Sequence, residues 1–126
     1  MKTVYYAHAI CIYGRKTERE ELRIISHQLR EVKIENPAAY ANHPEKRTDT
    51  MGFCFRLVER SDTVVFSRLL GKVTAGVGKE VNHALQLGKP VFELVGQKLV
   101  KRTRPVKYIT RDETVALYGK WRANES

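Results

Sequence analysis

The sequence predicts a small α/β fold of the Rossmann-like (flavodoxin-like) class, in which a parallel sheet has helices on both faces. Three observations lead to this prediction. Short runs of β-branched and aromatic residues recur along the chain, amphipathic segments separate them, and Gly, Pro or Asn stands at the junctions. Strands that alternate with helices in this way form right-handed βαβ units, and therefore a parallel sheet.

The composition indicates one domain over residues 1–126. Apolar residues make up 42% and charged residues 29% of the chain, a balance typical of a protein with one packed core. No apolar run approaches the ~20 residues of a membrane span, and no signal-peptide cleavage pattern follows the first strand. Cys11 and Cys54 lack the spacing of a zinc or redox motif. We therefore expect buried thiols, a cytoplasmic location and no metal or other cofactor.

The N-terminal elements are a strand and a helix. Residues 3–12 mix β-branched and aromatic side chains, which indicates a first strand that ends near His8. The next segment, 17–32, has apolar residues at helical spacing. It opens with Thr17 and Glu20, which form a capping-box pattern.

The middle of the chain predicts a short strand, a long loop and a second helix. The strand over 33–35 stops at Asn36 and Pro37, because proline lacks a donor. Residues 38–50 are polar and are predicted to form a loop. Helical spacing then returns over 51–58.

A buried strand over 63–66 follows, and then a third helix over 74–87 that Gly88 closes. The fourth strand covers 90–95. After it the pattern weakens, with an extra strand predicted at 104–109 and a short helix at 112–118.

The charge of the chain favours an anionic partner. The net charge is +9, and residues 97–126 carry eight basic and three acidic residues, so we treat 96–126 as a basic C-terminal extension of undefined structure. Its basic run is open to three interpretations: a solvated face, contact with a ligand phosphate across a dimer, or nucleic-acid contact. Interleaved aromatic residues and a recognised motif are missing, so we do not expect a nucleic-acid partner.

Candidate site residues gather at one edge of the predicted sheet. In open parallel sheets, ligands bind beyond the carboxyl ends of the strands. That edge should collect Tyr5, Tyr6 and His8 after the first strand, Ser67 and Arg68 after the third, and Glu80 after a glycine turn. Asp62 precedes its strand, so we expect it at the opposite edge in a structural role.

Gly76-x-Gly78 lies at the start of the third helix, where backbone amides can face an anion. The spacing matches neither the dinucleotide fingerprint nor the P-loop, so an NAD site and an ATPase are not supported. We expect Glu80 in the first turn of the helix, where the helix dipole would keep its carboxylate ionised.

The stretch from Thr74 to Ala84, with Leu85-Gln86-Leu87-Gly88-Lys89-Pro90-Val91 after it, resembles the signature of the nucleoside 2-deoxyribosyltransferase superfamily. Its closest branch is the 2′-deoxynucleoside 5′-phosphate N-hydrolases. The resemblance extends to Val4-Tyr5-Tyr6-Ala7-His8-Ala9-Ile10, Gly14-Arg15 and Ser61-Asp62-Thr63-Val64-Val65, and so covers roughly residues 3 to 95.

The resemblance implies roles for these residues. Glu80 matches the nucleophile that attacks the anomeric carbon, and Tyr5 matches the tyrosine that orients it. Thr74 stands where the phosphate-preferring branch has a serine. The cradle for a 5′-phosphate would then consist of Thr74, Gly76, Gly78, Gly14 and Arg15. The edge rule, and not the resemblance, adds Ser67 as a further ligand contact. The resemblance also implies a homodimer in which a neighbouring subunit completes the site.

Two residues depart from the family pattern. Cys54 stands where the family has an aspartate that assists base departure, and a thiol is a weak donor with a higher pKa. His8 replaces a small glycine, and we assign it a catalytic role as proton donor, with His43 as the alternative donor.

We therefore predict cleavage or transfer of the N-glycosidic bond of (deoxy)nucleoside 5′-monophosphates by a retaining displacement through Glu80. The first alternative is a non-catalytic nucleotide-binding or sensor domain on the same fold. A phosphoribohydrolase with a glycine-rich turn before its glutamate is a second enzyme alternative, whose spacing fits less well.

Overall fold

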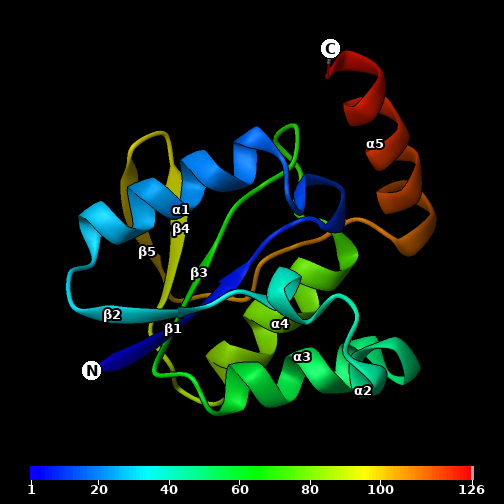
Figure 1. Cartoon of the computed structure of the whole chain (residues 1–126). Coiled ribbons are helices and arrows are strands. Elements are labelled where there is room, and N and C mark those ends of the chain that lie inside the picture. Colours follow the sequence, from blue (N-terminus) through cyan, green and yellow to red (C-terminus); the bar gives the residue numbers. More distant parts are fainter. Residues whose placement is uncertain (126) are drawn as a thin grey trace.

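The computed structural model describes residues 1–125 and contains a five-stranded sheet in the order β2-β1-β3-β4-β5 (Figure 1). The first four strands are parallel, and the last pairs antiparallel with its neighbour. This confirms the Rossmann-like α/β prediction, with one antiparallel edge added. The strands are β1 (Lys2–Ala7), β2 (Val32–Glu35), β3 (Thr63–Phe66), β4 (Val91–Val95) and β5 (Lys98–Arg102).

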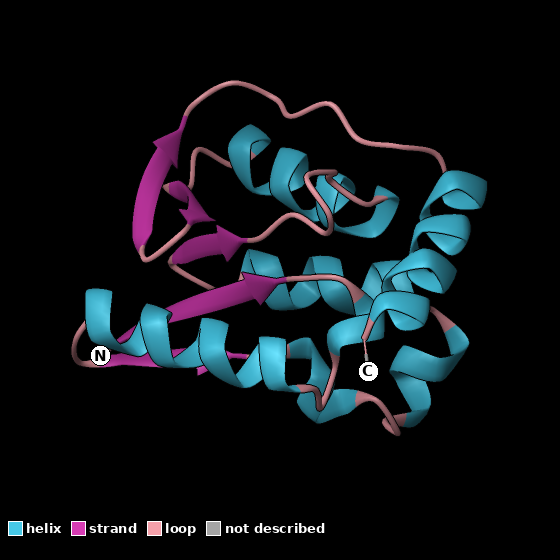
Figure 2. Cartoon of the chain, turned by 90° about the horizontal axis from the view of Figure 1, so that it is seen from above, coloured by secondary structure: helices cyan, strands magenta, loops and turns pink. Residues whose placement is uncertain are grey.

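Helices cover both faces of the sheet. α1 (Lys16–Gln28) lies on one face, and α3 (Thr50–Glu59) and α4 (Ala75–Gln86) lie on the other (Figures 1 and 2). Because successive residues of a strand point to opposite faces, Tyr5 belongs to the α3 and α4 core, whereas Tyr6 belongs to the α1 core. α5 (Arg111–Asn124) stands beyond the carboxyl ends of the parallel strands (Figure 1).

The start of α1 differs from the prediction. The helix begins at Lys16 with Arg15 as a N-cap that makes no side-chain hydrogen bond, so the Thr17 capping box was wrong. Glu18 takes the capping role instead, because its Oε1 accepts a 3.0 Å hydrogen bond from the amide of Gly14. The helix also ends earlier than predicted, since the chain must turn back to pair β2 with β1.

The predicted loop over 38–50 was also wrong, because it contains two short helices. These are η2 (Pro37–Tyr40) and α2 (Pro44–Thr48). Each begins with a capping residue followed by proline: the Asn36 side chain accepts from the amide of Ala38, and the His43 ring accepts from the amide of Glu45.

The C-terminal extension is ordered as a hairpin strand and a helix. β5 covers Lys98–Arg102 and the segment 103–110 has no regular structure, so the strand predicted at 104–109 was misplaced. Gly96 has φ +62° and turns the chain back onto β4. Part of the basic run thus lies on an edge strand, where charge discourages pairing with another chain. α5 runs to Asn124 and begins with a complete capping box of Thr110 and Glu113.

Asp62 lies at the edge opposite the candidate site, as expected. Its carboxylate accepts a 2.8 Å hydrogen bond from the amide of Thr3, at the start of β1. Within residues 1–125, no helix combines the length and the apolar character that a membrane span requires.

Candidate functional site

The site centres on Glu80, which reaches from α4 toward the end of β1. The hydroxyl of Tyr5 donates a 2.9 Å hydrogen bond to Glu80 Oε2, and both side chains are buried. α4 begins at Ala75 with Thr74 as its N-cap, so Glu80 is in the second turn and not in the first. The expected stabilisation of its carboxylate by the first-turn dipole is therefore lost, because that effect fades within one turn.

Cys54 lies against the same carboxyl group. Burial raises the pKa of the Cys54 thiol to about 12, so the sulfur keeps its proton beside Glu80, and the thiol lowers the pKa of that carboxyl group. The residue that departs from the family pattern thus contacts the predicted nucleophile directly. In this position the thiol helps Tyr5 to hold the carboxyl group.

The pKa of the Glu80 carboxyl group lies close to neutral pH. Burial raises the pKa of its carboxyl group to about 7, against the opposing effects of the hydrogen bonds from Tyr5 and Cys54 and of the Lys46 charge. We expected an ionised group, and the difference has a physical cause, since desolvation outweighs the donors. A buried carboxyl group of this kind can exchange a proton near neutral pH.

A small cavity opens beside Glu80 at the carboxyl edge of the sheet. Its volume is about 40 Å³, close to the ~30 Å³ that one water occupies in the liquid. Sites for small organic ligands usually span roughly 300 to 1,000 Å³. The walls come from the β1 end, α3, α4 and α5 and consist of His8, Ile10, Tyr13, Thr50, Met51, Cys54, Thr74, Gly76, Val77, Glu80 and Tyr118.

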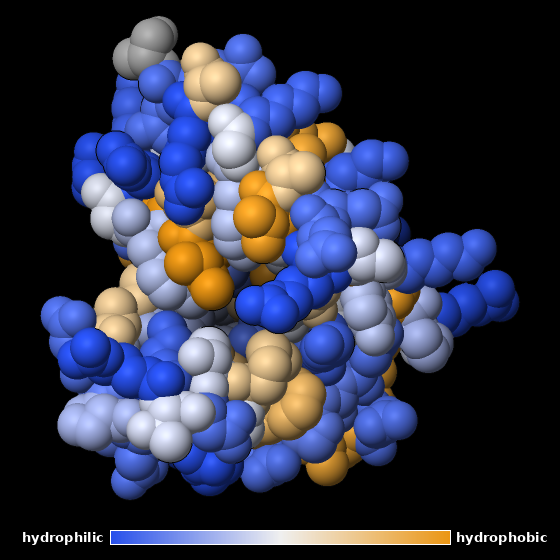
Figure 3. All heavy atoms as spheres, turned by 90° about the vertical axis from the view of Figure 1, so that its right-hand side faces the viewer, coloured by the Kyte–Doolittle hydropathy of each residue, from blue (hydrophilic) through white to orange (hydrophobic). Residues whose placement is uncertain are grey.

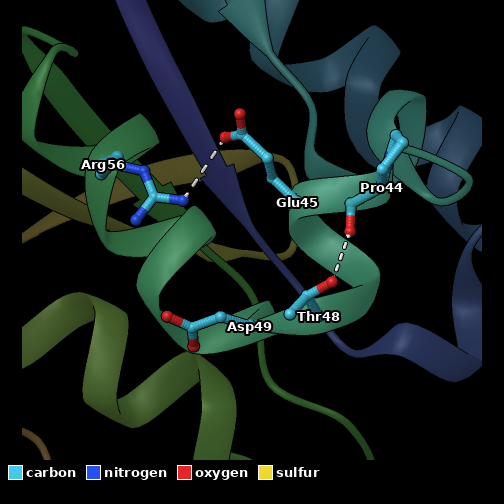
Figure 4. A pocket seen from close by; sticks show the side chains of 5 residues that line it. All are labelled: Pro44, Glu45, Thr48, Asp49 and Arg56. Atoms are coloured by element: carbon cyan, nitrogen blue, oxygen red, sulfur yellow. Dashed lines mark hydrogen bonds and ion pairs between the residues drawn. The ribbon is translucent and has the colours of Figure 1, made fainter.

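Figure 3 shows the molecule from the side that carries α5, with a hollow between the upper part of the view, which contains α5, and the lower part. A wider surface depression of about 350 Å³ lies elsewhere, where α2 meets α3 (Figure 4). Its polar groups pair with one another: Arg56 lies 3.7 Å from Glu45, and Thr48 donates to the carbonyl of Pro44. We therefore assign no ligand to this depression.

Lys46 is a site residue that the sequence analysis missed. Its side chain comes from α2, is buried, and donates a 2.9 Å hydrogen bond to the carbonyl of Pro37. The ammonium group lies 5.0 Å from the centre of the Tyr13 ring, and its charge acts on Glu80 and Cys54. The sequence signal was weak, because one lysine in a polar segment is usually exposed.

His8 lines the cavity, but both of its ring nitrogens are engaged. Nδ1 lies 3.0 Å from the carbonyl oxygen of Tyr6, and Nε2 lies 2.7 Å from Glu18 Oε2. Because a carbonyl only accepts, Nδ1 carries a proton, and the contact with Glu18 holds a further proton between ring and carboxyl group. Burial lowers the pKa of His8. A role as proton donor to a leaving base would require the ring to leave one of these partners. The alternative donor, His43, caps α2 and does not line the cavity.

The predicted phosphate cradle is assembled only in part. The amide of Gly14 donates to Glu18, and that of Gly78 donates to the carbonyl of Thr74, so neither is available to a ligand. A Cβ at Gly78 would come within 2.3 Å of the Tyr108 ring, so close packing explains this glycine. Thr74 and Gly76 do line the cavity.

The two other predicted phosphate contacts lie outside the cavity wall. Arg15 is exposed and lies 3.7 Å from Glu125 near the end of α5. Ser67 belongs to the α1 face, where its hydroxyl donates a 2.7 Å hydrogen bond to Glu21. Tyr6 donates to the same Glu21 oxygen at 2.6 Å, so this face has a carboxyl cluster of its own.

The fold and the site define an α/β protein with a buried, titratable carboxyl group at the carboxyl edge of a mostly parallel sheet. Comparisons of the chain with protein-family models, with curated protein sequences and with solved structures find no match. Among residues 1–125, no group of three or more His, Cys, Asp or Glu side chains is arranged to hold a metal ion.

Proposed function

We propose that this protein cleaves or transfers the N-glycosidic bond of (deoxy)nucleoside 5′-monophosphates, with Glu80 as the nucleophile. The observation that carries the proposal is the buried Glu80 carboxyl group, held by Tyr5 and Cys54 on the wall of a cavity at the carboxyl edge of the sheet. The resemblance of residues 3–95 to the nucleoside 2-deoxyribosyltransferase superfamily supports it.

The proposed reaction is a double displacement at the anomeric carbon. Tyr5 holds one oxygen of the Glu80 carboxylate, and the other oxygen forms a bond to C1′ while the bond from C1′ to the base breaks. The base leaves with the bonding electron pair and takes up a proton. Water or a second base then attacks C1′ and releases the carboxylate, so the two inversions retain the configuration.

The ionised form of Glu80 is the reactive form. A pKa of about 7 leaves about half of the molecules ionised at neutral pH, and a nucleophile with a raised pKa is more reactive once ionised. Activity should therefore rise with pH through about 7 and then level off.

The proposed substrate carries a 5′-phosphate because of the charge of the chain and the groups at the start of α4. The net charge is +9, and Thr74 and Gly76 line the cavity six and four residues before Glu80. We expect the monophosphate to bind more tightly than the nucleoside, since charge-assisted hydrogen bonds contribute about 1.5 to 3 kcal/mol each. Equal affinity by calorimetry would contradict the phosphate assignment.

The catalytic test compares the wild type with Glu80→Gln, and uses Glu21→Gln on the opposite face as a matched control. Base released from a panel of deoxynucleoside monophosphates is measured by chromatography. We expect Glu80→Gln to lose at least about a thousandfold in rate, because an amide is a far weaker nucleophile of nearly the same shape. Unchanged turnover in Glu80→Gln would overturn the proposal.

A second candidate is a nucleotide-binding or sensor domain without catalysis. It is favoured by Cys54, which stands at the position of the family's aspartate. If the wild-type protein binds a nucleotide but releases no base from any nucleotide tested, the result would support this candidate over the catalytic proposal.

A homodimer is part of the proposed function. Ile10, which lines the cavity, and Leu70 are about half exposed, at 52% and 49%, and apolar side chains of this kind are often covered in an assembly. Light scattering at micromolar concentration should report twice the monomer mass.

A further inference from the structure

α5 packs against the mouth of the candidate site. Its inner face carries Leu117, Tyr118 and Trp121, which pack on a small apolar cluster that includes Cys11 and Leu69. Tyr118 also forms part of the cavity wall beside Glu80. α5 is thus the C-terminal wall of a cavity that is too small for a nucleotide.

α5 also places oxygen atoms on the polar groups around the cavity. Thr114 Oγ1 accepts a 3.0 Å hydrogen bond from the amide of Ala75, the first residue of α4. The Tyr118 oxygen accepts from the amide of Ile10 at 3.4 Å, and Tyr118 and Thr74 both line the cavity.

The end of α5 repeats this arrangement. The Glu125 carboxylate lies 3.7 Å from the guanidinium of Arg15. In all of these contacts α5 supplies the acceptor and the site supplies the donor. A phosphate group is itself an acceptor, and Thr74 and Arg15 are two of the residues predicted to bind it.

We propose that α5 occupies the phosphate position of the site in the free protein, so that docking of α5 and binding of a phosphate-bearing ligand exclude each other. This inference rests on the proposed function for the chemical class of the ligand. The hydroxyls of Thr114 and Tyr118, one helical turn apart on α5, take the places of phosphate oxygens. Glu125 lies about three turns beyond Thr114, at the end of α5, and holds Arg15 separately. Release of α5 frees their donors and removes the Tyr118 wall from the cavity.

The segment before α5 is fixed, which makes α5 a tethered unit. The backbone of Val106 forms two hydrogen bonds with the Asn82 side chain, at 2.8 and 3.1 Å, and the amide of Ile109 donates to the carbonyl of Val73 at 3.0 Å. Thr110 then caps α5 and marks the hinge. Within α5 only Thr114 is buried, so the main cost of releasing the helix is the exposure of the small apolar cluster beneath Leu117, Tyr118 and Trp121.

The chain contains a natural reporter of this movement. Trp121 is its one tryptophan, and it lies half-buried on the docked face of α5. Its emission should shift to longer wavelength when α5 leaves the apolar cluster. Excitation at the red edge of tryptophan absorption avoids absorption by the nucleobase.

The test uses the full chain as wild type, Thr114→Val, Tyr118→Phe and the double variant. Both substitutions remove an acceptor oxygen and keep the shape that packs. Val115→Thr, at a neighbouring position whose side chain is 60% exposed, is the matched control. Each protein is titrated with a deoxynucleoside monophosphate, with the same nucleoside and with inorganic phosphate, while Trp121 emission, calorimetric binding and base release are measured.

We expect the monophosphate to shift the Trp121 emission of the wild type to longer wavelength. The double variant should show part of that shift without ligand and bind the monophosphate about tenfold more tightly, because two hydrogen bonds that hold α5 in place are lost. Each single variant should fall between the two, and Val115→Thr should behave as the wild type.

The outcomes separate this inference from the proposed function. Three results would overturn the proposal that α5 closes the site. The first is monophosphate binding that is unchanged or weaker in both single variants, and the second is no binding by the double variant. The third is saturating binding to the wild type without a change in Trp121 emission. Tighter binding with the expected emission shift, but no base release, supports the closure and contradicts the catalytic proposal. Base release without a change in Trp121 emission supports the catalytic proposal and contradicts the closure by α5.

Discussion

The two faces of the sheet hold similar carboxyl clusters around neighbouring residues of β1. On one face Tyr5 donates to Glu80, and on the other Tyr6 donates to Glu21. Burial raises the pKa of both carboxyl groups. A perturbed pKa therefore does not distinguish a reactive carboxyl group from a structural one in this protein.

The difference between the faces lies in the space beside the carboxyl group. Glu80 borders a cavity. Glu21 is instead held by two donors, the hydroxyls of Tyr6 and Ser67, which pack between the sheet and α1. A carboxyl group can attack a ligand only where the ligand can approach it. We therefore propose that Glu80, on the α4 face, is the reactive carboxyl group, and that the Glu21 cluster holds α1 against the sheet.

The largest effect in this comparison should come from the two tyrosines. Tyr5→Phe removes the donor that orients Glu80, and we expect the rate of base release to fall about 10- to 100-fold, the value of one hydrogen bond to a charged group. Tyr6→Phe should destabilise the fold by about 1 to 3 kcal/mol and leave the rate unchanged. Urea unfolding and base release measured on both variants check this, and equal rates for the two would remove the functional distinction between the faces.

The next effect concerns stability and pH. The folded state favours the protonated form of Glu80, so the stability that this preference contributes is complete below the ordinary pKa of 4.5 and is lost as the pH rises through about 7. The difference between 4.5 and about 7 corresponds to roughly 3 kcal/mol.

Glu80→Gln carries no charge at any pH. Its stability relative to the wild type should therefore increase between pH 5 and pH 8, up to about 3 kcal/mol. Urea midpoints across this range measure the increase. A difference that does not depend on pH would mean that Glu80 titrates normally.

The smallest effect should come from the cysteines. Cys54→Ala removes a weak donor from Glu80, so we expect its pKa to rise and the rate at neutral pH to fall roughly threefold. Cys11→Ala is the matched control, because Cys11 is also buried but belongs to the cluster beneath α5. Cys54→Ser should restore the rate, since a hydroxyl donates more strongly. A rate loss that Cys54→Ser fails to recover would assign Cys54 to packing alone.

Much of the fold was predictable from the sequence. The strand at 63–66 was predicted at its observed bounds, and β4 and α4 within a residue at each end, because apolar runs and the residues Gly88 and Pro90 mark them clearly. The prediction placed the last strand at 104–109 and missed β5, because the basic residues of this edge strand hide its alternation of apolar and polar side chains. α2 was missed because five residues are too few for a helical period to show.

The site was predictable in its centre and not in its surroundings. The edge rule and the resemblance both selected Tyr5 and Glu80, and the structure brings these residues into contact; their catalytic roles remain predictions. Lys46 and Tyr118 reach the site from α2 and α5, and no local pattern shows where such a side chain will end. The raised pKa of Glu80 was missed for the same reason, because burial is a property of the whole fold.

The most direct test of the account is the capture of a sugar ester on Glu80. A deoxynucleoside monophosphate whose sugar carries a 2′-fluorine slows breakdown of such an ester, and mass spectrometry of the digested protein locates the adduct. We predict an added mass equal to the fluorinated sugar phosphate on the peptide that contains Glu80, with none on that peptide in Glu80→Gln. Rapid base release by the wild type with the adduct on another residue, or with no adduct under any condition of quenching, would contradict Glu80 as the nucleophile.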